Sequence, residues 1–252
     1  MNINQSLAAL YQTHWTDLCG SLDENGLYDY SYNPLLLHID NIDDFNCADI
    51  RVMLFGQDMS QGDWYKYERN DDVLSKCMPA LTTFDNKLGA ISHGIRQKRG
   101  MGGGMNLFID ILNSKMPQKQ IRYVWNDIVK LGRNIKYNDK GRILIDIEKR
   151  VFDVIKKEVD IVRPHVIVFF TGPSLFWEQK LQDKFSLSNN DYHVLDGWPN
   201  IRQAAQLSLD TLSFPSVKIA FRLSHPCARK IKRRDLYIIV AERIVSSLNI
   251  KD

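Results

Sequence analysis

Four short apolar segments constrain the fold of this chain more than any other feature of its sequence. Each is rich in β-branched or aromatic residues and is followed by polar or turn-forming residues, which is the pattern of a buried strand. The segments are residues 51–56 (RVMLFG), 121–126 (IRYVWN), 165–171 (HVIVFFT) and 217–223 (VKIAFRL). The third is almost continuously apolar, and this is typical of a strand that is covered on both faces.

Helical spacing of apolar residues marks the chain between and around these segments. Residues 143–162 are predicted to form one crossover helix, residues 235–248 a closing helix, and the stretch from Leu7 to Leu18 an amphipathic helix. Strands that alternate with helices predict an α/β fold, here a three-layer α/β/α sandwich with a central four-stranded parallel sheet. Because the strands span nearly the whole chain, residues 1–252 are expected to form one domain. The weakly periodic stretch from about 59 to 104 is expected to be an irregular insertion that caps the site.

Cysteine usage and hydropathy narrow the class of protein. Cys19, Cys47, Cys77 and Cys227 are scattered without a C-x-x-C pair, which predicts reduced thiols rather than a disulfide framework or a structural zinc site. The N-terminal stretch lacks the pattern of a signal peptide, and no apolar run approaches the roughly 20 residues of a membrane span. We therefore expect a protein that is neither secreted nor membrane-bound, located in the cytoplasm, or in the nucleus of a eukaryote.

The distribution of charge along the sequence is more informative about binding partners than the net charge of +3. Residues 222–234 (RLSHPCARKIKRR) hold six cations and no acid, and a second basic stretch, RQKR, occupies residues 96–99. Basic clusters on an otherwise balanced chain favour contact with phosphates. The alternative for either cluster alone is a solvated basic helix end.

Polar residues follow the predicted strands at the edge where parallel sheets bind their ligands. Gln57 and Asp58 follow the first strand, Asn126 ends the second, and Ser224 and His225 follow the fourth. A carboxylate there can orient a water or stabilise a cation, and an amide can read the edge of a base with one donor and one acceptor. An imidazole can donate a hydrogen bond to an oxygen that becomes anionic. Taken singly, each residue has a structural alternative as a turn residue or a core histidine.

A glycine run at residues 100–104 (GMGGG) invites comparison with phosphate-binding loops. No Lys-Ser or Lys-Thr follows it, and Met105 stands where the last glycine of G-x-G-x-x-G belongs. The run is better explained as a flexible loop or as a close approach of backbone to a ligand.

Taken together, these motifs resemble those of the uracil-DNA glycosylase superfamily. Gly56-Gln57-Asp58 resembles the start of its GQDPYH motif, and His225-Pro226 resembles the start of HPSPL. RYVWNDIVKLGRN resembles the TNVVKCRP strand of the thermostable bacterial branch, with matches at Asn126 and Lys130, and RPHVIVFFTGPS from Arg163 resembles PKVIVALG of that branch. The four matches occur in the family's order and cover about residues 51 to 234.

The resemblance implies a role for each matched residue. Asp58 activates or positions the water and stabilises the sugar cation, and His225 stabilises negative charge on the departing base. Asn126 reads the base, with Gln57 and Ser60 beside it. Residues that contact the DNA, with Arg229 or Ile231 as the wedge that fills the gap left by the base, are Ser224, Arg229, Lys230, Ile231, Lys232 and Arg233. The partner is DNA with one base flipped out of the stack.

Departures from the family pattern affect the substrate and the cofactor. The Pro-Tyr of the first motif is Met59-Ser60 here, and in the family that tyrosine blocks the methyl group of thymine, so a broader range of bases is expected. The stacking phenylalanine has no counterpart, and the ring is expected from Trp64, Tyr65 or Phe108. The cysteines do not match the iron–sulfur ligands of the thermostable branch, so we expect no cofactor and no metal.

The expected function is that of a monomeric DNA glycosylase in base excision repair, hydrolysing the N-glycosidic bond of uracil or a related damaged or mismatched base. Two alternatives are open from the sequence. The first is a catalytically inactive module of the same fold that binds nucleic acid or a protein partner. The second is an α/β protein whose basic rim binds a free nucleotide.

Overall fold

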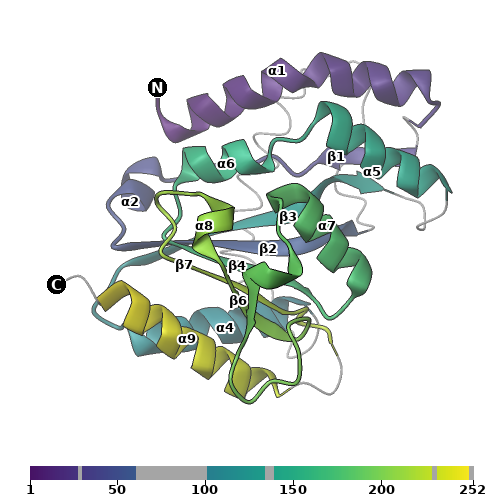
Figure 1. Ribbon diagram of the computed structural model, residues 1–252. Helices are drawn as coiled ribbons and strands as arrows, with labels where there is room; N and C mark the ends of the chain where they lie inside the picture. The colour runs from purple at the N-terminus through teal and green to yellow at the C-terminus, as the bar shows by residue number, and fades with distance from the viewer. Residues whose placement is uncertain (28–29, 61–100, 134–138, 229–231, 250–252) are drawn as a thin grey trace.

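A mixed seven-stranded sheet forms the centre of the protein, with the strand order β1-β3-β2-β4-β7-β6-β5. The computed structural model describes residues 1–27, 30–60, 101–133, 139–228 and 232–249 (Figure 1). The four central strands are β3 (Ile121–Arg133), β2 (Ile50–Ser60), β4 (Val166–Gly172) and β7 (Ile219–Ser224), and all three of their pairings are parallel. They overlap the four predicted segments, although β4 begins one residue and β7 two residues later than predicted, so the α/β class and the parallel arrangement of these strands are confirmed.

The prediction of a four-stranded sheet is wrong, because three short strands extend it by antiparallel pairing. These are β1 (Ser31–Pro34), β6 (Ala204–Leu207) and β5 (Tyr192–Val194). Segments of three or four residues are too short to show the two-residue periodicity of a strand. β1 pairs with a strand that is distant along the chain, Ser31 opposite Arg133, and only the folded sheet brings the two together.

Helices cover both faces of the sheet, which gives three layers (Figure 1). Phe169 and Phe170 are neighbours in β4 and therefore point to opposite faces. Phe169 packs on Phe185 of α7, with ring centroids 5.1 Å apart, whereas Phe170 packs on Phe108 of α4 at 5.6 Å and on Tyr237 of α9 at 6.0 Å. The helices on the α7 face are α1 (Ile3–Glu24), α5 (Asp139–Val151), α6 (Ile155–Val162) and α7 (Leu175–Phe185), and those on the other face are α4 (Met101–Lys115) and α9 (Arg233–Asn249).

Two short helices complete the described elements, α2 (Ile42–Asn46) and α8 (Leu209–Leu212), together with a 3-10 turn at Asn189–Asp191. The predicted N-terminal and closing helices are confirmed as α1 and α9. Helix α1 begins with a capping box, in which Asn2 and Gln5 each accept a hydrogen bond from the other's backbone N–H at 2.9 Å. No helix within the described ranges has the length and apolar character of a membrane span.

The prediction of one crossover helix over residues 143–162 is wrong, because helix α5 ends at Val151 and a separate helix, α6, begins at Ile155. Phe152 and Val154 are both fully buried, and the centroid of the Phe152 ring lies 6.3 Å from that of Tyr11 and 6.4 Å from that of Trp15. A continuous helix would turn residues two apart in different directions, so burying both side chains favours the break.

The glycine run does not form a flexible loop where the structure describes it, since residues 101–104 lie in the first turn of α4. The predicted alternative, a close approach of backbone to a ligand, stays a prediction, and the close approach that the structure shows is to another part of the protein. A Cβ at Gly104 would lie 2.6 Å from Cβ of Pro226. The run therefore lets the start of α4 pack against the turn that follows β7.

Candidate functional site

Two of the predicted site residues lie near the carboxyl end of β2, inside the strand rather than after it. Gln57 and Asp58 are both partly exposed, and the Gln57 amide donates to the carbonyl oxygen of Thr171 in β4 at 3.3 Å. Ser60 is the last residue of β2, and its side chain lies outside the part of the structure that is described. Strands β2 and β3 thus extend further than the sequence predicts.

The pairing of β2 with β3 places Asp58 and Asn126 on opposite faces of the sheet. Asn126 is the pairing partner of Phe55, whose ring stacks on Phe169 at 4.8 Å and therefore faces α7. Asp127 pairs with Gly56, and Val129 pairs with Asp58. Because successive side chains alternate between faces, Asp58 shares the α4 and α9 face with Asp127, not with Asn126.

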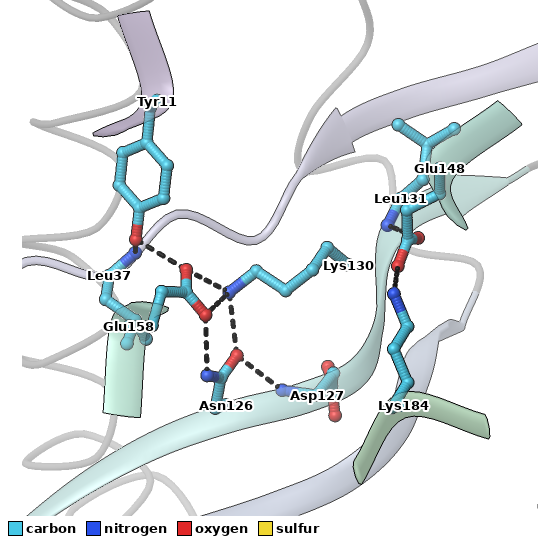
Figure 2. A network of polar contacts seen from close by, with 9 residues as sticks. All are labelled: Tyr11, Leu37, Asn126, Asp127, Lys130, Leu131, Glu148, Glu158 and Lys184. Carbon is cyan, nitrogen blue, oxygen red and sulfur yellow. Dashed lines mark hydrogen bonds and ion pairs between the residues drawn. The ribbon is translucent and has the colours of Figure 1, made fainter. Parts of the chain in front are cut away.

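Asn126 belongs to a buried polar network on the α7 face (Figure 2). Its side chain is 0% exposed. The amide oxygen accepts from Nζ of Lys130 at 2.7 Å and from the backbone N–H of Asp127 at 2.9 Å, and the amide nitrogen donates to Oε2 of Glu158 at 2.9 Å. The donor and acceptor expected to read a base are therefore engaged within the protein.

Lys130 and Glu158 form the ion pair at the centre of this network, and both side chains are 0% exposed. Lys130 Nζ lies 2.8 Å from Oε1 and 3.0 Å from Oε2 of Glu158. Glu158 also accepts from the Tyr11 hydroxyl at 2.6 Å, and that hydroxyl accepts from the backbone N–H of Leu37 at 2.8 Å. The Lys130 ammonium therefore donates to both Asn126 and Glu158. The network links α1 and α6 to β3, and we therefore interpret it as stabilising the fold.

A second buried pair fixes the far end of β3 (Figure 2). Glu148 of α5 accepts from the backbone N–H of Leu131 at 2.8 Å and from Nζ of Lys184 at 3.1 Å. Lys184 also donates to Asp153 at 2.9 Å. This pair stabilises the extension of β3 beyond the predicted strand.

Asp127 is a carboxyl group on the Asp58 face that the sequence analysis did not single out. Its side chain is 2% exposed, and within the described residues Oδ1 has no hydrogen-bond partner. The carboxyl group and the ring of Trp125 cover Gly56 so closely that a Cβ there would lie 2.2 Å from Oδ1 and 2.3 Å from the ring. Burial first, and then the charge of Asp58, hold the pKa of the Asp127 carboxyl well above its usual range.

His225 follows β7 in a tight turn that is anchored to the end of β4. Its backbone N–H donates to the carbonyl oxygen of Gly172 at 2.7 Å. The ring Nδ1 accepts from the backbone N–H of Cys227 at 3.1 Å, so in the neutral ring Nε2 carries the proton and is the donor. Burial, and then the positive charge of Arg233 at the start of α9, lower the pKa of His225 and favour that neutral form.

The basic cluster at residues 222–234 divides into a buried and an exposed part. Arg222 is fully buried, bonds to Thr171 Oγ1 at 3.3 Å and lies 3.7 Å from Glu178, so it stabilises the interior and cannot contact DNA. Ser224 is buried as well and donates to the carbonyl oxygen of Gln203 at 2.9 Å, which argues against its predicted contact with DNA. Lys232 is exposed and Arg233 partly exposed.

Several predicted residues fall outside the described part of the chain, namely Trp64, Tyr65, Arg229, Lys230 and Ile231. Phe108, the third candidate for a stacking ring, is fully buried against Phe170 and Tyr237, so it belongs to the core. Within the described ranges, no group of three or more His, Cys, Asp or Glu side chains is placed to hold a metal ion.

The structure thus brings Asp58, Asp127 and His225 to one face and one edge of the sheet, and it places Asn126 in the opposite layer. Strand alternation gave a signal for Asp127, since it follows Asn126 directly and must point the other way. Comparison with models of known protein families and with curated protein sequences finds no match to this chain, so its function is proposed from its motifs and from this geometry.

Proposed function

We propose that this protein is a DNA glycosylase that hydrolyses the N-glycosidic bond of uracil or a related damaged or mismatched base, as in base excision repair. The observation that carries the proposal is the position of Asp58 and His225. They lie at the carboxyl ends of two parallel strands, β2 and β7, on the face covered by α4 and α9. Ligands of parallel α/β sheets bind at this edge.

The chemistry of base release needs two charges to be stabilised. The sugar becomes cationic as the bond to the base breaks, and the departing base becomes anionic. A partly exposed carboxylate such as Asp58 stabilises the cation and positions the attacking water, whereas a neutral imidazole that donates from Nε2 stabilises the anion. No step of this reaction calls for a redox cofactor.

Exposed cations near His225 support DNA as the partner. Lys232 precedes α9 and Arg233 begins it, and in the sequence they follow directly on the residues predicted to include the wedge. Phosphate contacts there would help to offset the cost of extruding the base, a few kcal/mol. DNA binding by this surface is therefore expected to weaken steeply as salt is raised.

Base release from defined oligonucleotides tests the proposal. The purified protein is incubated with DNA that contains uracil, hypoxanthine, xanthine or a mismatched base, and the free base is measured. We expect release from at least one of these, and a loss of about 100-fold or more in Asp58→Asn and His225→Ala. The matched controls, Asp139→Asn and His193→Ala, change exposed side chains and should leave the rate unchanged. No release from any substrate would refute the proposal.

A second candidate is an inactive module that binds DNA without cleaving it. The engagement of the Asn126 amide by Lys130 and Glu158 favours this alternative, because the predicted base-reading group is not available on the Asp58 face. Salt-sensitive binding to DNA without any product in the same assay would support it.

A further inference from the structure

Asp127 is a buried carboxyl group that the proposed chemistry does not use. It lies on the same sheet face as Asp58, its side chain is 2% exposed, and Oδ1 has no hydrogen-bond partner within the described residues. Polar atoms that are buried in proteins nearly always have a partner. The Oδ1 atom beside Asp58 is therefore available to form a hydrogen bond with a polar atom of a ligand.

Contacts on both sides of β3 fix the position of the Asp127 carboxyl group. The carboxyl group and the Trp125 ring cross over Gly56, where even a single added carbon would lie 2.2 Å from Oδ1. On the other face, the Asp127 backbone N–H donates to the Asn126 amide oxygen at 2.9 Å. The position of Asp127 is thus set from both sides, by the glycine beside it and by the buried network behind it.

On the premise that the chain removes a base from DNA, we propose that Asp127, and not Asn126, contacts the ring edge of the extruded base. A protonated carboxyl group offers one donor and one acceptor, which is the pattern of the amide that it replaces in this role. It complements a base edge with a ring N–H beside a carbonyl, as in uracil, hypoxanthine and xanthine. Asn126 is then a positioning residue that acts through the backbone N–H of Asp127.

The charged groups around Asp127 favour its protonated form. Burial has the largest effect on its pKa and raises it, Asp58 of β2 raises it further, and Glu148 of α5 does so weakly. Lys130 of β3 and a hydrogen bond with the Trp125 side chain oppose the shift. The net direction is upward, so the group is neutral at acidic pH and loses its donor as pH rises through its pKa.

Single-turnover base release and binding to an uncleavable uracil analogue in DNA test this inference. Asp127→Ala removes both hydrogen-bonding groups and should lose about tenfold or more in affinity and rate, because a good pair of hydrogen bonds discriminates on this scale. Asp127→Asn keeps one donor and one acceptor and should stay within about threefold of the unaltered protein. Asp146→Asn, on the exposed side of α5, is the matched control.

The pH profile gives a readout that a purely structural role would not move. The unaltered protein should lose affinity for the analogue as pH rises through the pKa of Asp127, and Asp127→Asn should lack that loss, because its amide does not titrate. Thermal melting of each variant separates these effects from unfolding. If Asp127→Ala does not fold, the pH profile of Asp127→Asn alone tests the inference.

The possible outcomes separate the inference from the proposed function. Base release by the unaltered protein and by Asp127→Ala at equal rates would overturn the inference and leave the glycosylase proposal standing. An equal loss of affinity and rate in Asp127→Asn and Asp127→Ala would also overturn the inference. It would mean that one donor and one acceptor at this position do not suffice. An unaltered protein that releases no base and binds no analogue overturns both.

Discussion

Replacing Lys130 with methionine should destabilise the protein by about 3–5 kcal/mol, because it leaves the carboxylate of Glu158 buried without its cation. Both side chains are 0% exposed and their nearest charged atoms lie 2.8 Å apart. At an effective dielectric constant of about 20, that distance corresponds to an attraction of about 6 kcal/mol, from which the cost of removing both charges from water is subtracted. Methionine keeps most of the apolar stem, so the lost charge dominates the effect.

Urea denaturation followed by circular dichroism measures this loss as a change in the free energy of unfolding. Lys149→Met is the matched control, because Lys149 lies 3.4 Å from Asp183 with the two side chains 56% and 49% exposed. An exposed pair of this kind contributes at most about 1 kcal/mol. The double variant Lys130→Met/Glu158→Gln buries no charge and should recover part of the lost stability.

Two results would refute this reasoning. A loss of less than about 1 kcal/mol in Lys130→Met would mean that the ion pair is not buried as described. A double variant no more stable than Lys130→Met would mean that the unpaired carboxylate is not the cause of the loss. Base release measured well below the melting transition adds a functional test. We expect Lys130→Met to lose less activity than Asp127→Ala, because Lys130 contacts the Asn126 amide oxygen that receives the Asp127 backbone N–H, and does not contact the base.

Two further predictions concern the Asp58 face. Gly56→Ala should destabilise the protein by about 1–3 kcal/mol in the same urea assay, because a Cβ there would lie 2.2 Å from a buried carboxyl oxygen, whereas Gly20→Ala, with nothing within 4 Å, should not. Arg233→Gln should raise the pKa of His225 in an NMR titration, since Arg233 helps to lower it, and Arg234→Gln should leave it unchanged. The folded pKa of His225 lies below the ordinary value, so the unfolded chain protonates first and stability falls as pH drops from about 6.5 through the folded pKa. Arg233→Gln should reduce that loss, and an equal acid sensitivity of both variants would contradict the assignment.

The helices and strands could be predicted where a pattern of apolar residues lies within one segment and continues over enough residues to be recognised. The four parallel strands are marked by short apolar runs, since they are covered on both faces, and helices α1 and α9 are marked by helical spacing of apolar residues. The break between α5 and α6 could not be predicted. Helical spacing of apolar residues continues through Val151, Val154 and Ile155, and the break depends on the burial of Phe152 against α1, which is a tertiary contact.

The candidate site was predictable in part, for a related reason. The sequence by itself predicts that Asp58, Asn126 and His225 lie at the ends of apolar segments, and so toward one edge of a parallel sheet. The face to which each side chain points depends on the register between β2 and β3, which is set by contacts between residues about 70 positions apart. Only the tertiary structure decides that Asn126 turns inward to Glu158 while Asp127 turns toward Asp58. The physical cause is the pleat of the strand, which sends neighbouring side chains to opposite faces.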